Sequence, residues 1–178
     1  MKAFFYGLLS AAVLALAGGY AFVVTGMMPA NADSPPPGLE KWAAHRSLKA
    51  AIAREAPLGA GPVALDDAAL VAGVKVYAQN CLVCHGGADG QASNIALGLY
   101  QHAPQLATHG VEDDAEGETY WKVHHGIRLT GMPGFSQTLT EQQQWQVTLF
   151  LKHMDSLSPA VAKAWKALAL PSAQAAVR

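Results

Sequence analysis

The N-terminal part of the chain contains one long run without a charged side chain, Phe4 to Met28. These 25 residues are mostly apolar, and as a helix they would extend roughly 37 Å, beyond the bilayer hydrocarbon core of about 30 Å. Pro29 is expected to end the helix, because proline lacks the amide hydrogen that a continuing helix needs. Only 14% of the chain is charged, against about 25% in soluble domains. The run predicts a transmembrane anchor over residues 1–28.

The charges around this run indicate its orientation. Lys2 is the only charged side chain before it, and Asp33 is the first one after it. The positive-inside rule then places the N-terminus in the cytoplasm and the remaining chain outside. A signal peptide cleaved after Ala32 is the alternative, because residues 30–32 fit the A-x-A pattern. The run is longer than the usual apolar region of a signal peptide, which favours an uncleaved anchor. Both an uncleaved anchor and a cleaved signal peptide imply that the rest of the chain is exported from the cytoplasm.

Composition divides the rest of the chain into three further segments. Residues 29–62 contain three consecutive prolines and then an alanine-rich stretch, which predicts an extended linker followed by a spacer helix lying on the domain. Residues 63–158 are expected to form the main domain, and residues 159–178 an alanine-rich tail. The formal net charge of −1 argues against a nucleic-acid-binding protein, which needs a basic excess.

The main domain contains three helical patterns and no convincing strand, which predicts an all-α fold. The first helix begins at Asp66 or Asp67, which are favourable N-cap residues, and Gly73 in its interior suggests the close approach of another helix backbone. The second pattern covers residues 118–125. The third begins at Thr140 with a capping box. Long turn-rich loops separate the helices, and loops of this length usually serve a function or surround a cofactor.

The two cysteines of the chain form one motif with the residue that follows them. Cys81, Cys84 and His85 make up C-x-x-C-H, the signature of c-type haem attachment. Two thiols at this spacing can each form a thioether with a haem vinyl group, and the histidine can then bind the iron. A redox dithiol would follow a strand, and a zinc site would need four ligands. The motif therefore predicts one covalent haem c, with His85 as a metal ligand.

Met132 is the candidate for the second axial iron ligand. It lies between Gly131 and Pro133 in a loop downstream of the motif, so its side chain is presented by constrained backbone instead of packing on a helix face. A thioether ligand would stabilise ferrous iron and raise the potential relative to two histidines. A histidine is the alternative, and His124 or His125 could in principle reach the iron.

These features together resemble a class I c-type cytochrome over residues 66–157. The stretch 121–135 (WKVHHGIRLTGMPGF) is similar to membrane-anchored monohaem cytochromes found with bacterial respiratory and dehydrogenase complexes. The resemblance implies a cytochrome c fold, with three main helices and long loops around one haem. It also implies that a backbone carbonyl beside a loop proline, which Pro104 fits by position, accepts a hydrogen bond from the haem-ligating histidine. The further residues expected near the haem are Tyr100, Trp121 and Arg128, with Arg128 able to pair with a propionate. The stretch departs from the family at His125, where asparagine is common.

The expected function is one-electron transfer between membrane or periplasmic redox partners of the respiratory chain, without enzymatic turnover by the chain itself. The location expected is the bacterial cytoplasmic membrane, with the haem domain facing the periplasm. Two alternatives remain. One is a small-ligand sensor or peroxidase-like enzyme with a displaceable sixth ligand. The other is a fixed electron-transfer subunit of a dehydrogenase or terminal oxidase complex.

An acidic run precedes the second helix. It contains five carboxylates between Glu112 and Glu118, whereas the whole chain is nearly neutral. Such a run predicts either a docking patch for a basic redox partner or a solvated loop that aids solubility.

Overall fold

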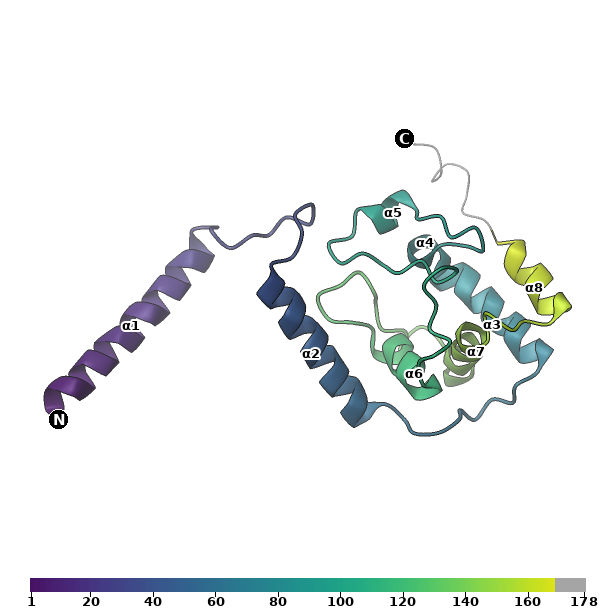
Figure 1. Cartoon of the computed structure of the whole chain (residues 1–178), viewed down its shortest axis with the longest axis horizontal. Helices are drawn as coiled ribbons and strands as arrows, with labels where there is room; N and C mark the ends of the chain where they lie inside the picture. Colours follow the sequence, from purple (N-terminus) through teal and green to yellow (C-terminus); the bar gives the residue numbers. More distant parts are fainter. Residues whose placement is uncertain (169–178) are drawn as a thin grey trace. The chain divides into compact units, whose positions relative to one another are not determined.

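The computed structural model describes residues 1–168, and the chain divides into two compact units. The first unit is residues 1–32, and the second begins at Asp33. Within residues 1–168 all regular structure is helical (Figure 1), as the sequence predicts. Half of the predicted tail, residues 169–178, lies outside the described residues.

The first unit consists of helix α1 (Lys2–Val24), and none of its residues is buried. Its length and apolar composition are sufficient to cross a membrane. The helix ends at Val24 and not at Met28 as expected. The Thr25 hydroxyl donates a hydrogen bond to the Ala21 carbonyl at 2.6 Å, and Gly26 adopts a φ of 72°, so the chain turns before Pro29 is reached. The 23 helical residues still extend roughly 34 Å.

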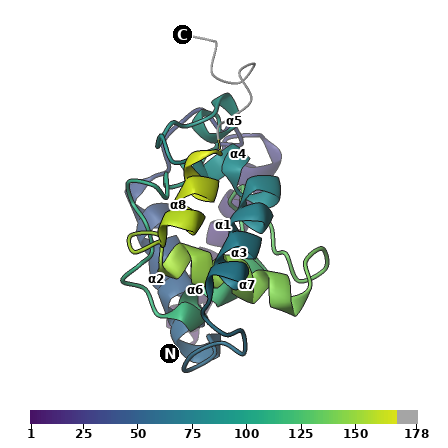
Figure 2. The same cartoon turned by 90° about the vertical axis from the view of Figure 1, so that its right-hand side faces the viewer.

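The second unit is built on helices α3 (Asp67–Asn80), α6 (Glu116–His125) and α7 (Glu141–Lys152). α7 packs against both α3 and α6, and α8 (Pro159–Lys166) packs against α3. Figure 2 shows α8 beside α3. Two one-turn helices, α4 (Leu82–His85) and α5 (Asn94–Leu97), follow α3.

The ends of these helices agree closely with the predicted caps. Asp66 accepts a hydrogen bond from the Ala69 amide at 2.7 Å at the start of α3. Thr140 and Gln143 form both hydrogen bonds of the capping box at the start of α7. α6 begins two residues earlier than expected, at Glu116, because Gly117 is buried under Pro57 and continues the helix.

α3 and α7 cross at Gly73. A side chain at this position would collide with the Gln146 carbonyl oxygen and with Cβ of Phe150, so the two helices approach as closely as the sequence suggests. Beside the crossing, the rings of Tyr77, Phe150 and Trp165 pack edge to face, with centroids 5.3 to 5.7 Å apart. Trp165 belongs to α8, so the first helix of the predicted tail is part of the hydrophobic core.

A Gly73→Ala substitution should lower the stability of the domain. Alanine favours an exposed helix by about 1 kcal/mol over glycine, but overpacking a core typically costs about 1–3 kcal/mol. Because the added methyl group would collide with the backbone of α7, we expect the cost of overpacking to exceed the gain in helix propensity. Urea unfolding of the detergent-solubilised chain measures whether the substitution lowers or raises the free energy of unfolding. Gly98→Ala is the matched control, because a Cβ there would meet only ordinary contacts at 3.5 Å. Unfolding of the Gly73 variant at a higher urea concentration than wild type would contradict the close crossing.

The spacer helix, α2 (Gly38–Glu55), lies on the domain as predicted. Ile52 is buried, the Trp121 indole donates a hydrogen bond to Glu55 at 3.3 Å, and the Tyr100 hydroxyl donates one to Glu40 at 2.8 Å. Both ends of α2 are thus held against the domain. The compact unit therefore extends beyond the expected limits of residues 63–158 on both sides.

Candidate functional site

The two cysteines lie where α3 ends and α4 begins. The Cys81 amide donates to the Tyr77 carbonyl at 2.8 Å, and the His85 amide donates to the Cys81 carbonyl at 2.9 Å, so the C-x-x-C-H motif forms one helical turn. The buried Tyr77 hydroxyl donates to the Gly86 carbonyl at 2.7 Å, which attaches the end of this turn to the core. The motif is therefore fixed by the helix before it and by the glycine after it.

The loop after the motif is tied back to it by three hydrogen bonds. The Leu106 amide donates to the His85 carbonyl at 3.2 Å, and the Gln105 side chain donates to the Cys84 carbonyl at 3.0 Å. His85 Nδ1 lies 2.9 Å from the Pro104 carbonyl oxygen, the contact expected from the resemblance. Because a carbonyl only accepts, Nδ1 carries the hydrogen and Nε2 keeps its lone pair.

Burial favours the neutral form of the same imidazole. It lowers the pKa of His85, and the hydrogen bond to Pro104 opposes this effect only in part. An unprotonated Nε2 is the state in which imidazole binds a metal. Burial, together with the neighbouring Cys84, raises the pKa of the Cys81 thiol to about 12, so this thiol is neutral at ordinary pH.

The loop between α6 and α7, which carries Met132, is held against the end of α6 by backbone hydrogen bonds. The Phe135 amide donates to the Val123 carbonyl at 3.0 Å, and the Ile127 amide donates to the Met132 carbonyl at 3.1 Å. Gly126 adopts a φ of 66°, and a side chain there would collide with the backbone of Pro133 and Gly134. The glycine thus ends α6, as predicted, and allows the loop to pack against it.

Both loops and the motif surround one cavity of about 320 Å³, a volume typical of cofactor sites. Five of the predicted site residues line it: Cys81, Cys84, His85, Pro104 and Met132. Much of the remaining wall is apolar and includes Leu99, Leu106, Val123, Ile127, Phe135 and Leu151. The buried hydroxyl of Thr119, also in the wall, has no hydrogen-bond partner among the described residues.

These residues fit a haem. The cavity brings together two thiols for covalent attachment, an imidazole with a free Nε2 and a thioether, within a largely apolar enclosure. This donor set matches the thiol, imidazole and thioether groups that hold haem c. No cluster of three or more possible metal-binding His, Cys, Asp or Glu side chains occurs in the described part of the chain, so the iron would depend on the haem and the Met132 thioether as well as on His85.

Three predicted residues do not line this cavity. Tyr100 and Trp121 turn toward α2, where they bond Glu40 and Glu55. Arg128 is exposed, and within residues 1–168 its guanidinium has no hydrogen bond or ion pair. The resemblance placed these side chains near the haem by position alone, and it carried no information about α2.

The histidines differ from the expectations in one respect. His124 Nδ1 lies 2.9 Å from the Gln144 side-chain oxygen, and neither His124 nor His125 lines the cavity. His102 is exposed, but it does line the cavity. The structural alternative to Met132 is thus His102.

Sequence reasoning missed further cavity residues, including two that come from helices. Leu48 comes from α2 and Lys122 from α6. Leu48 shares a weak apolar face of the α2 sequence with Ala44, Ala51 and Ile52, and this face was a possible signal. Lys122 follows a tryptophan within an amphipathic helix, and no pattern in the sequence distinguishes it from a solvated lysine.

Comparison with known proteins gives one family. Residues 68–151 match the family described as cytochrome C oxidase, cbb3-type, subunit III. The matched range contains the C-x-x-C-H motif, the cavity loops and nearly all of α3 and α7. Comparisons with curated proteins and with solved structures gave no match.

Proposed function

We propose that this chain, whose residues 68–151 form a c-type cytochrome domain, is a one-electron carrier with a single haem c attached to Cys81 and Cys84. The observation that carries the proposal is the 2.9 Å contact between His85 Nδ1 and the Pro104 carbonyl. It orients the imidazole with Nε2 free, in a cavity that Met132 also lines.

The side chains divide the work of holding the group. Cys81 and Cys84 would provide the covalent attachment, and His85 and Met132 would bind the iron. A bound haem would supply a reversible change between ferric and ferrous iron, with a potential set by its axial ligands. If His85 and Met132 both bound the iron, no coordination position would remain for a substrate, which would favour electron transfer over enzymatic turnover.

The wild-type chain should undergo a reversible one-electron transition and should not bind carbon monoxide in the ferrous state. A redox titration followed by visible absorption measures the number of electrons, and spectra recorded with and without carbon monoxide test the sixth position. A ferrous spectrum that changes on adding carbon monoxide, together with peroxide consumption, would instead support the sensor or peroxidase alternative.

The anchor determines where electrons are carried. α1 would span the bacterial cytoplasmic membrane and hold the cytochrome domain on the periplasmic face, where haem is attached to exported chains. Its length of 23 residues and its apolar composition support this location. The proposed partners are redox proteins of the respiratory chain at that membrane.

The acidic run is partly engaged within the domain. Asp114 forms an ion pair with Lys122 at 2.6 Å, and Glu116 accepts a hydrogen bond from the Gly61 amide at 3.2 Å. Asp113 remains exposed. These contacts support a structural role for part of the run, so the partner-docking role is left with fewer free carboxylates than the sequence suggests.

A second candidate is a fixed subunit of an oxidase complex, which the description of the matched family favours. The chemistry would be the same, and only the permanence of the partnership would differ. Gentle solubilisation followed by identification of co-purifying proteins distinguishes the two. A terminal oxidase recovered in constant ratio supports the subunit, and recovery of the monomeric cytochrome alone supports the mobile carrier.

A further inference from the structure

The Lys122 side chain lies between two cavities of the domain and lines both of them. It lines the cavity proposed for the haem, and it also lines a cleft of about 570 Å³ between α2 and α6. Among the described residues that line the haem cavity, it is the only lysine or arginine. The only other titratable groups in that lining are the two cysteines, His85 and His102.

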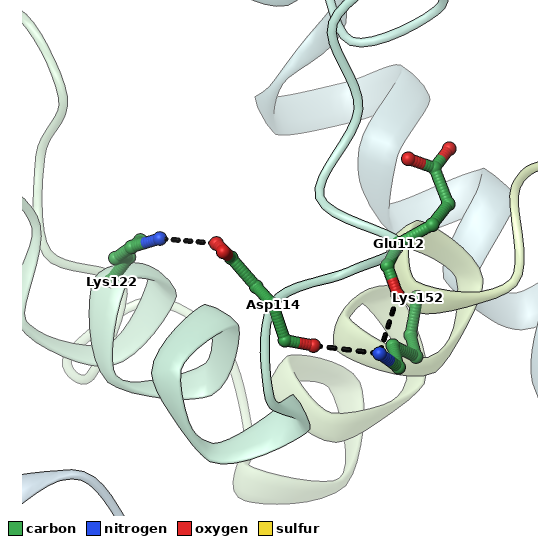
Figure 3. A network of polar contacts seen from close by, with 4 residues as sticks. All are labelled: Glu112, Asp114, Lys122 and Lys152. Carbon is green, nitrogen blue, oxygen red and sulfur yellow. Dashed lines mark hydrogen bonds and ion pairs between the residues drawn. The ribbon is translucent and has the colours of Figure 1, made fainter.

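The Lys122 ammonium is held by an ion pair with Asp114 (Figure 3). Lys122 Nζ lies 2.6 Å from Asp114 Oδ2, and the two side chains are 24% and 29% exposed. A pair so largely removed from water is screened less than a surface pair. The contact therefore fixes the ammonium in place instead of leaving it to sample solvent.

Asp114 is in turn fixed through its backbone. Lys152 Nζ, from α7, donates hydrogen bonds to the carbonyl oxygens of Asp114 at 2.7 Å and Glu112, as Figure 3 shows. The loop that carries Asp114 is thus tied to α7. The resulting series, Lys152 to Asp114 to Lys122, joins the core helix to the wall of the cavity.

A haem brings two propionate carboxylates, and a carboxylate near an apolar enclosure needs a cation or hydrogen-bond donors to offset its desolvation. Arg128, the residue first expected for this role, is exposed and does not line the cavity. We propose that Lys122 is the cation that pairs with a haem propionate, and that Asp114 is a positioning residue that holds the ammonium and partly offsets its charge. This extends the haem site proposed above.

The other charged groups near Lys122 are those of the α2–α6 cleft. They are His45 and Lys49 from α2 and Glu118 from α6, and none of them lines the haem cavity. Lys49 therefore provides a matched control, since it is a lysine in the same cleft but outside the cavity.

Substitutions of the two residues in this ion pair should have opposite effects on the midpoint potential. A cation beside the haem favours the reduced state, which carries one more negative charge, so Lys122→Met should lower the midpoint potential. Asp114→Asn leaves the ammonium without its counter-charge and should raise the midpoint potential. Lys122→Arg should restore most of the wild-type value, because it keeps the positive charge.

Redox titration of the purified, haem-loaded full chain measures these shifts, with Lys49→Met and Arg128→Met as controls. Opposite shifts for the Lys122 and Asp114 variants, with small shifts for the controls, support the proposal. If the ion pair were merely structural, either substitution would break it equally. Shifts of the midpoint potential in the same direction for the two variants, or no shift in either, would therefore overturn the proposal. A larger effect of Arg128→Met than of Lys122→Met would do the same. Failure of the wild-type chain to bind haem covalently would instead contradict the proposed function itself.

Discussion

Replacing Met132 by alanine should open the sixth coordination position, lower the reduction potential and allow carbon monoxide to bind the ferrous protein. The fall in reduction potential should be large, because axial ligands are among the factors that spread haem potentials over about 0.8 V. The loop should survive the change, since its hydrogen bonds from Phe135 to Val123 and from Ile127 to Met132 involve only backbone atoms.

Met154→Ala is the matched control for this prediction. Met154 packs against the hydrophobic core and does not line the cavity, so its loss should reduce stability without changing the spectrum or the binding of carbon monoxide. If the Met132 variant keeps the wild-type ferric and ferrous spectra, Met132 is not the ligand. His102 would then be replaced next, since it lines the cavity whereas His124 and His125 do not.

The main helices were predictable because their signals are local. The Asp66 cap and the Thr140 capping box depend on side chains within one turn of the helix end, and both are present in the structure. Gly73 indicated a helix crossing because glycine in a helix interior needs a compensating contact. α8 was underestimated, since Val161 and Trp165 are only two apolar anchors among alanines, and their burial depends on α3 and α7.

The site was predictable where covalent chemistry fixes the spacing, and less so where tertiary packing decides. Cys81, Cys84 and His85 lie within five consecutive residues, and the glycine- and proline-bounded loop predicted Met132, which lines the same cavity. The positions of Tyr100 and Trp121 depend instead on where α2 lies, since both bond its carboxylates. Lys122 became visible only when the cavity and its ion pair with Asp114 were located together.

The central claim is that one haem is joined covalently to the chain through Cys81 and Cys84. Both thiols line the cavity at the end of α3, and neither forms a disulfide. Replacing one thiol should leave a single thioether, lower the holoprotein yield and shift the haem absorption band. Replacing both removes every cysteine of the chain and should abolish attachment.

The most direct test is the intact mass of the denatured chain, with haem staining on a denaturing gel, for the wild type and for the Cys81→Ala, Cys84→Ala double variant expressed with a haem-attachment system. Ser93→Ala, which removes a hydroxyl that donates a hydrogen bond to the Val83 carbonyl inside the motif, controls for local disturbance. We expect the mass of one haem on the wild-type and Ser93→Ala chains and none on the double variant. A wild-type chain without added mass, or a double variant that stains at full strength, would contradict the account.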